Sequence, residues 1–260
     1  MINAIKAEIL KLQRKKLWLI IGISLLIYFL CILGTMSDGM GNINGRDFRS
    51  FLIDPYILIL FSHSIAVGIF GISMFSNEYR DKTMGQLVLA SVSMFRLFVA
   101  KITVLLIFSV VLMLGFVVEI ILCGIVLGYQ EITSFNILLT LTFFMQSAVM
   151  LILGLLPVIF IGILSKRNTI LPITSLFLYL MITLLPSMGI IKIDNDIMAY
   201  IYPFGGAVTL QRDFLYYFMP ADFTGWITPT TNTLLCLFCL IAFSIAFSIL
   251  SIYYLKKKEL

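Results

Sequence analysis

Few residues of this 260-residue chain are of a type that performs acid–base or nucleophilic chemistry. There is one histidine, His63, and it lies inside an apolar stretch. A serine protease within a membrane would need a serine nucleophile beside such a base. The chain has no Gly-x-Ser-Gly turn, and no pair of aspartates lies inside an apolar run. We therefore expect no catalytic residues, and an intramembrane protease or lipid transferase stays only as an alternative.

Metal and nucleotide chemistry lack their usual ligands as well. Cys236 and Cys239 have the CxxC spacing, but no second pair accompanies them, so we interpret them as small apolar residues of a helix. A nucleotide-binding P-loop needs the pattern G-x-x-x-x-G-K-[ST], which is absent from the sequence. We expect this chain to bind no metal and no cofactor, and any ATP hydrolysis coupled to it must come from another polypeptide.

Three polar residues, His63, Glu119 and Gln146, interrupt long apolar runs. Helical rise places His63 and Gln146 at a similar depth and Glu119 about 27 Å beyond Lys101, close to the far interface. His63 and Gln146 are expected to hydrogen-bond to each other across a helix contact. Glu119 fits a hydrated position at the membrane–water interface. The alternative is that all three line an outward-facing cavity or a dimer interface that handles a cationic or amphipathic substrate.

A charged stretch covers residues 77–98, between two apolar runs. Asn77 is a residue type that caps helix N-termini, and Glu78 and Asp81 follow it, where a helix dipole favours acids. Met84, Leu87 and Val88 then form a short apolar stripe, which residues 91–93 interrupt. The pattern predicts a capped amphipathic helix, followed by a second short basic helix that leads into the next apolar run.

The elements that position these residues are expected to be membrane-spanning helices. The chain is 61% hydrophobic and 12% charged, with a mean hydropathy of +1.08, which is far from the composition of soluble domains. A span needs roughly 20 apolar residues, and none of the apolar runs alternates as a barrel strand would. We predict an all-α membrane protein with six transmembrane helices at residues 17–36, 55–76, 101–127, 137–164, 169–190 and 233–255.

The distribution of Lys and Arg predicts the orientation. If the N-terminus is cytoplasmic, only Arg46, Arg49, Lys192 and Arg212 lie outside, which leaves 14 of the 18 basic residues inside. Positive residues near spans are retained on the cytoplasmic side. Both termini are therefore expected in the cytoplasm, and the net charge of +5 reflects this topology and does not indicate nucleic acid binding.

Two further segments do not fit the pattern of full spans. Residues 1–16 alternate apolar and basic positions with helical period, which predicts an amphipathic helix at the inner membrane surface. Residues 196–228 contain two short apolar stretches, 197–204 and 214–220, each associated with a proline. Both stretches are too short to cross, so we predict an extracellular re-entrant element before the last span.

The stretch between the second and third predicted spans resembles the ABC-2 type permease family. The matching residues occur in the family's order: Glu78, Asp81, Lys82, Thr83, Leu87, Ser93, Arg96 and Lys101. The resemblance implies that 1–260 is a single ABC-2 type transmembrane domain and that this stretch is a coupling helix held by a separate ATPase subunit. The residues it assigns to ATPase coupling are Glu78, Tyr79, Arg80, Asp81, Lys82, Thr83, Met84, Leu87, Arg96 and Lys101.

The resemblance also implies a function and partners. The chain is expected to be the permease subunit of an ATP-driven exporter in the bacterial cytoplasmic membrane, with ATP and Mg on the partner ATPase and with a second permease as a homodimer or a sister chain. Short permeases of this kind resemble those of lantibiotic immunity, bacitracin resistance and peptide toxin export, so amphipathic or antimicrobial peptides are the expected substrates. Export of a small solute or ion and a purely structural assembly role are the alternatives.

Overall fold

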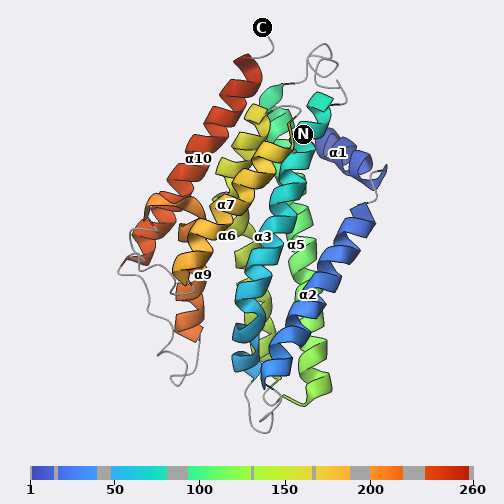
Figure 1. Ribbon diagram of the computed structural model, residues 1–260, viewed down its shortest axis with the longest axis vertical. Helices are drawn as coiled ribbons and strands as arrows, with labels where there is room; N and C mark the ends of the chain where they lie inside the picture. The colour runs from blue at the N-terminus through green and yellow to red at the C-terminus, as the bar shows by residue number, and fades with distance from the viewer. Residues whose placement is uncertain are drawn as a thin grey trace.

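In the computed structural model the chain forms a bundle of long helices (Figure 1). The structure describes residues 2–14, 17–39, 48–80, 93–129, 132–165, 168–187, 200–218 and 232–257. Its helices are α1 (Ile2–Arg14), α2 (Leu17–Gly39), α3 (Phe48–Arg80), α5 (Met94–Leu127), α6 (Ser134–Ser165), α7 (Ile170–Ser187), α9 (Pro203–Phe218) and α10 (Thr233–Lys257). The described residues contain no strand, so the prediction of an all-α protein is confirmed for them.

Among the residues that the structure describes, four helical segments are long and apolar enough to cross a membrane: Leu58–Arg80, Met94–Leu127, Ser134–Ser165 and Thr233–Lys257. They correspond to the second, third, fourth and sixth predicted spans. In the first and fifth predicted spans, the described apolar stretches are the shorter Ile21–Gly34 and Ile170–Ile182. The protein is therefore a multi-pass membrane protein, and the count of six spans stays a prediction.

The arrangement of the helices brings α1 and the end of α10 to the same end of the bundle (Figure 1). The successive long helices run up and down between this end and the opposite one, and α6 lies near the middle, where it packs against α3, α5, α7, α9 and α10. We call the end that carries α1 and the last turn of α10 the terminal end. The predicted placement of both chain termini on one side agrees with this arrangement.

The helices that flank residues 81–92 extend beyond the predicted spans. α3 continues through Asn77 to Arg80, and α5 starts at Met94. The prediction that Asn77 caps a new helix is therefore wrong: its side-chain oxygen instead accepts a hydrogen bond from Arg80 Nη2 at 2.7 Å within the last turn of α3. The predicted separate basic helix before the third span is also wrong, because no break separates Met94 from the rest of α5.

In the region predicted as re-entrant, the described residues 200–218 include α9, which covers the end of the first predicted apolar stretch and the start of the second. α9 begins at Pro203, which was expected to end an apolar stretch. Proline suits the first turn of a helix, where its missing N–H is not needed. α9 packs closely on α6 because Gly154 has no side chain there: a Cβ at this position would lie 3.0 Å from Phe204 Cα. Residues 196–199 and 219–228 lie outside the described part of the chain.

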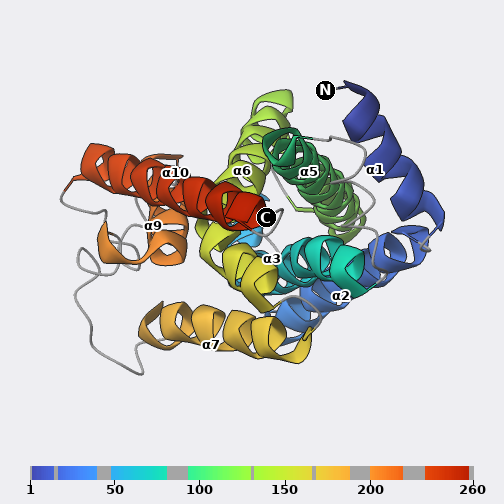
Figure 2. The same ribbon diagram turned by 90° about the horizontal axis from the view of Figure 1, so that it is seen from above.

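The short helix α1 lies across the bundle axis, just before the start of α2 (Figure 1). Viewed from above, it sits at the edge of the bundle beside α5 (Figure 2), and its main packing partner is α5. Ile5 and Ile9 pack against the core, whereas Lys6, Leu10 and Lys11 are exposed. This is the amphipathic pattern predicted for residues 1–16.

Candidate coupling site

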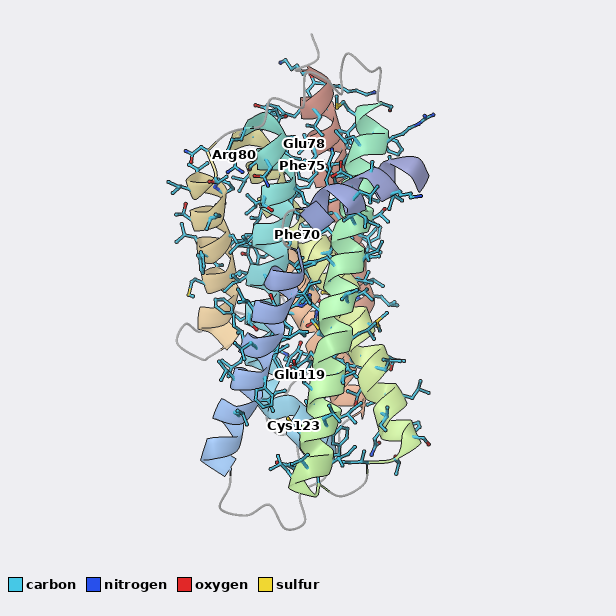
Figure 3. The ribbon with its side chains drawn as sticks, turned by 90° about the vertical axis from the view of Figure 1, so that its right-hand side faces the viewer. Phe70, Phe75, Glu78, Arg80, Glu119 and Cys123 are labelled. Atoms are coloured by element: carbon cyan, nitrogen blue, oxygen red, sulfur yellow. The ribbon has the colours of Figure 1, made fainter. Side chains whose placement is uncertain are left out.

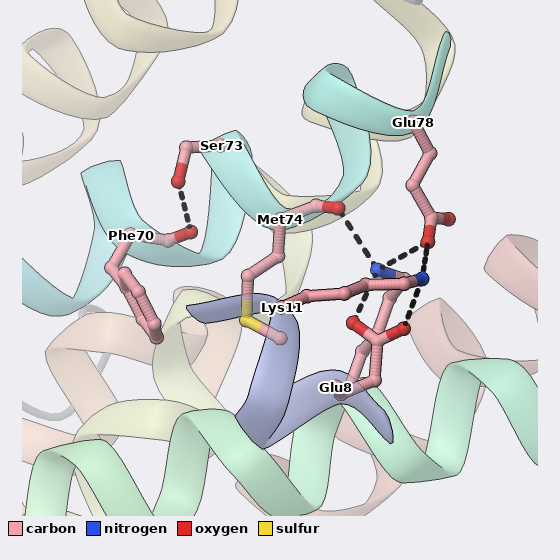
Figure 4. A network of polar contacts seen from close by, with 7 residues as sticks. Glu8, Lys11, Phe70, Ser73, Met74 and Glu78 are labelled. Carbon is pink, nitrogen blue, oxygen red and sulfur yellow. Dashed lines mark hydrogen bonds and ion pairs between the residues drawn. The ribbon is translucent and has the colours of Figure 1, made fainter. Parts of the chain in front are cut away.

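Four charged side chains meet where α1, α3 and α5 converge at the terminal end. Glu8 and Lys11 come from α1, Glu78 from the last turn of α3, and Lys101 from the second turn of α5. We call these four residues the charge cluster (Figure 4). Because Glu78 and Lys101 lie close to the two ends of residues 81–92, the cluster joins both flanks of that segment to α1.

Lys101 occupies the centre of the charge cluster. Its Nζ lies 3.0 Å from Glu8 Oε2 and 3.1 Å from Glu78 Oε1, and it donates to the backbone oxygen of Met74 at 2.9 Å. A lysine ammonium has three N–H donors, so these contacts use all of them. The ammonium also lies 5.4 Å from the centroid of the Phe75 ring, within the range of a cation–π contact.

Lys11 bridges the same two carboxylates. Its Nζ lies 2.8 Å from Glu8 Oε1 and 3.1 Å from Glu78 Oε1. Lys11 is 46% exposed at its side chain, whereas Lys101 is 1% exposed. The charge cluster thus has a sealed interior around Lys101 and one member, Lys11, that reaches the surface.

The charges in this cluster favour one another's ionised forms. Burial alone would raise the pKa of Glu8, but the neighbouring Lys101 and Lys11 offset this and leave the pKa below its ordinary value. Burial would lower the pKa of Lys11, but hydrogen bonds and the charges of Glu8 and Glu78 raise it. Two acids and two lysines balance to zero net charge. Removing one member would leave a buried charge without compensation, which is strongly destabilising.

The residues assigned to ATPase coupling have different positions in the structure. Glu78 and Lys101 meet in the charge cluster, Tyr79 is half-buried, and Arg80 and Arg96 are exposed. The other five assigned residues lie outside the described residues: Asp81, Lys82, Thr83, Met84 and Leu87. The structure therefore describes the two flanks of the predicted coupling helix and leaves the helix itself a prediction.

Sequence reasoning missed Glu8 and Lys11 as members of this site. A usable signal was present, because Glu8 is the one acid among the first sixteen residues. It falls on the helix face that also carries Ile5 and Ile9, and that face packs against the core. A lone acid on the buried face of a basic helix requires a partner, but the sequence does not identify Lys101 as that partner.

His63 forms a second polar contact, deeper in the bundle. Its Nδ1 lies 2.8 Å from the Tyr28 hydroxyl of α2, and its Nε2 lies 2.8 Å from the Ser109 hydroxyl of α5. All three side chains are fully buried. Both ring nitrogens are thus occupied by other groups, so the prediction that His63 hydrogen-bonds to Gln146 is wrong. His63 instead joins α3 to α2 and α5.

Glu119 and Gln146 lie on α5 and α6 and are partly exposed. Figure 3 shows Glu119 and Cys123 toward the end of the bundle opposite Glu78 and Arg80, which agrees with the predicted position of Glu119 near the far interface. Unlike these two residues, His63 has no exposed surface. Contact of Glu119 or Gln146 with a substrate stays a prediction.

A group of polar contacts on α9 was not anticipated from the sequence. The Tyr56 hydroxyl of α3 donates to Gln211 Oε1 at 2.6 Å, and the Thr233 hydroxyl of α10 donates to Asp213 Oδ2 at 3.2 Å. Gln211 and Asp213 are buried. Nearby, the ring of Phe214 stacks on Phe143 of α6, with centroids 5.6 Å apart. These contacts fasten α9 to three spanning helices.

Among the described residues, no group of three or more His, Cys, Asp or Glu side chains is placed to hold a metal ion. The chemistry that the described sites support is therefore ion pairing and hydrogen bonding between helices.

Comparison with known proteins identifies a family. A family model described as "ABC-2 family transporter protein" matches residues 4–183, which is more than two thirds of the 260 residues. No curated protein matches the chain significantly. The matched region runs from α1 into α7 and includes the whole charge cluster and residues 81–92.

Proposed function

Because this chain belongs to the ABC-2 family of transporter proteins, we propose that it is the permease subunit of an ATP-driven exporter and that an ABC ATPase docks on residues 81–92. Membership of the family makes the chain a transmembrane transport subunit and implies an ABC ATPase as partner. The docking segment, the direction of transport and the substrate are parts of the proposal.

The observation that carries the docking proposal is the charge cluster. Glu78 is three residues before the segment 81–92, and Lys101 is nine residues after it. Their ion pair, with an N–O distance of 3.1 Å, fixes the ends of α3 and α5 relative to each other. Force applied to the segment by a partner is therefore delivered to two spanning helices together.

The charge cluster also includes α1 in this unit. Lys101 contacts Glu8 at 3.0 Å and Lys11 contacts Glu78 at 3.1 Å, so two ion pairs cross between α1 and the flanks of the segment. Buried ion pairs contribute little net stability, but they can specify one arrangement of the groups that they join. We infer that α1, the end of α3 and the start of α5 move as one rigid body when the ATPase changes state.

The substrate proposal is an amphipathic or antimicrobial peptide, moved out of the membrane or the cell for secretion or self-immunity. It is supported by the resemblance to small peptide-handling permeases and by a chain that is 13% aromatic and contains 13 methionines. Methionine and aromatic side chains adapt to variable apolar ligands. A small solute or ion is the second candidate substrate.

The proposed assembly contains a second permease, either an identical copy or a sister chain, and an ATPase subunit for each. ATP and Mg are bound by the ATPase subunits, and the permease supplies docking and the path across the bilayer. On this assignment no residue of the chain is catalytic.

Docking is tested with a photo-reactive amino acid introduced at Thr83 in cells that also express an ABC ATPase encoded beside the chain. We expect a cross-link to the ATPase at this position and none from Asn168, an exposed residue at the same end of the bundle. Thr83→Arg should release the ATPase during co-purification, whereas Asn168→Arg should not. Equal cross-linking from both positions, or retention of the ATPase by Thr83→Arg, would contradict docking on this segment.

The substrate class is tested separately by measuring how much of a membrane-active peptide is needed to stop growth. Cells that express the chain with its ATPase should tolerate more peptide than cells whose ATPase carries a substitution of its P-loop lysine. Unchanged tolerance to peptides, together with ATP-dependent loss of a small solute from vesicles, would reject the peptide and support the second candidate.

A further inference from the structure

The outward face of α1 combines an apolar centre with a lysine at each edge. At 100° per residue, Ala7 and Leu10 lie in the middle of the exposed face, and Lys6 and Lys11 lie on either side of them. All four residues are exposed, and Leu10 retains 51% of its surface. Because Ile5 and Ile9 on the opposite side pack against the core, this face points away from the bundle.

The position of α1 brings this face to the level of lipid headgroups. The helix lies across the bundle axis immediately before α2 (Figure 1) and at the edge of the bundle (Figure 2). The apolar run of α2 starts at Leu17, three residues after α1 ends at Arg14. In this position the exposed leucine can contact acyl chains, and the lysines on either side of it can contact headgroups of the same lipid layer.

Lys11 has one hydrogen-bond donor left for a ligand. Its ammonium carries three N–H groups, and two are accounted for by Glu8 and Glu78. No third acceptor is recorded for it within the described residues, and its side chain is 46% exposed. Lys101 differs, because its three donors are all used and it is sealed from the surface.

The surrounding sequence adds further positive charge. Lys6, Lys11, Arg14, Lys15 and Lys16 place five basic residues within the first sixteen, against the single acid Glu8. Glu8 is engaged in the charge cluster. Clusters of four or more Lys and Arg on an amphipathic helix beside a span attract anionic lipid headgroups, with about 1 kcal/mol for each basic residue.

The geometry points to an anionic phospholipid binding site on the outward face of α1, in which Lys6 at one edge and the free donor of Lys11 at the other contact headgroup phosphate and Leu10 lies against the acyl chains. The phosphate adds a third acceptor to Lys11 without displacing Glu8 or Glu78. Bound lipid therefore holds α1 against the ends of α3 and α5. Its influence on transport rests on the proposed function, but the lipid binding itself does not.

Binding is measured on the purified full-length chain in phosphatidylcholine nanodiscs with increasing shares of phosphatidylglycerol. Site occupancy is read from cross-linking of a photo-reactive phosphatidylglycerol to α1. Wild-type protein should saturate with phosphatidylglycerol, and Lys6→Gln should weaken the binding roughly fivefold, the factor for about 1 kcal/mol. Lys11→Gln should weaken it similarly, and Lys11→Arg should restore it. Lys256→Gln, which removes an exposed lysine on α10 at the same end, is the matched control.

Each outcome bears on the proposal. Lys6 takes no part in the charge cluster, so Lys6→Gln remains informative if Lys11→Gln fails to fold. Equal labelling by a photo-reactive phosphatidylcholine, or unchanged binding in Lys6→Gln, would overturn the site. Binding of inorganic phosphate to the protein in phosphatidylcholine nanodiscs, lost in Lys6→Gln, would overturn the lipid assignment in favour of a soluble anion. Loss of ATPase docking with lipid binding intact would reject the proposed function and leave this site standing.

Discussion

At the scale of residues, Lys101 and Lys11 contact the same two carboxylates from very different environments. Lys101 is 1% exposed and has every donor satisfied, whereas Lys11 is 46% exposed. A buried charge in a balanced cluster chiefly fixes the geometry of the groups around it. Its removal leaves the opposite charges buried without compensation, which is destabilising. The two lysines should therefore respond differently to substitution.

Lys101→Met should lower the free energy of unfolding by about 3–5 kcal/mol, because the buried Glu8 and Glu78 would keep only the partly exposed Lys11 as a partner. The matched control is Arg96→Met, which removes a positive charge from an exposed position of the same helix and should have little effect. The thermal unfolding midpoint in detergent measures both variants. Equal midpoints for the two would show that the charge cluster is not a coupled unit.

The pH dependence of stability follows from the direction of the Glu8 shift. Its pKa in the folded protein is below the ordinary value of 4.5, so its stabilising contribution is fully present above pH 4.5 and is lost as the pH falls through the lowered pKa. The unfolding midpoint of Glu8→Gln should thus lie below that of the wild type at neutral pH, and the gap should narrow in acid. A gap that widens below pH 4.5 would contradict the assigned ion pairs.

Sequence reasoning reached half of the charge cluster. Glu78 and Lys101 were found because they lie in a recognisable order within one short stretch. Glu8 was not, since its partner is 93 residues away and a single sequence does not report long-range pairs. His63 shows the same limit: its depth in the bundle was predictable from the helical rise, but its partners Tyr28 and Ser109 were not.

At the scale of elements, the apolar runs predicted where helices lie better than where they end. α3 and α5 extend beyond their predicted bounds at the terminal end, where Glu78 in the last turn of α3 is paired with Lys101. Burial of Glu78 without such a partner would be costly. α9 was misjudged for another reason: the polar residues Gln211 and Asp213 lie between the two apolar stretches of the sequence, but Tyr56 and Thr233 hydrogen-bond to them inside the bundle.

The contact of α2 with the bundle should depend on its hydrogen bond to His63. Tyr28→Phe removes the hydroxyl that lies 2.8 Å from His63 Nδ1, a loss of about 1 kcal/mol in a membrane. Amide hydrogen exchange in α2 should become faster as a result. Tyr253→Phe removes a hydroxyl from an exposed site on α10 and is the control. Unchanged exchange in Tyr28→Phe would mean that apolar packing alone holds α2.

The seating of α9 should depend on the absence of a side chain at Gly154. In Gly154→Ala the new Cβ would meet the backbone of α9 at Phe204 Cα, 3.0 Å away. Overpacking of this kind costs about 1–3 kcal/mol, and we expect a lower unfolding midpoint. Gly22→Ala has nothing within 4 Å of the new Cβ and should not lower it. An unchanged midpoint in Gly154→Ala, with a lower one in Gly22→Ala alone, would mean that the contact between α6 and α9 is not tight.

At the scale of the whole molecule, several inferences depend on which face of the membrane the terminal end occupies. The structure places α1, both flanks of residues 81–92 and the last turn of α10 at this one end (Figure 1). Basic residues concentrate in the same segments, and the positive-inside rule assigns them to the cytoplasm. An ATPase is a cytoplasmic partner, so docking on residues 81–92 requires this assignment.

Single cysteines in a chain whose four native cysteines are replaced should reveal the orientation. Ser93→Cys and Asn168→Cys lie at exposed positions of the terminal end, whereas Thr133→Cys lies at an exposed position of the opposite end and Asn232→Cys at the exposed start of α10, away from the terminal end. In intact cells a membrane-impermeant thiol reagent should label only the second pair, and permeabilisation should add the first. The two pairs act as controls for each other, because all four sites are exposed residues just before the start of a helix. Labelling of Ser93→Cys in intact cells would place residues 81–92 outside the cell, where no ATPase could dock on them.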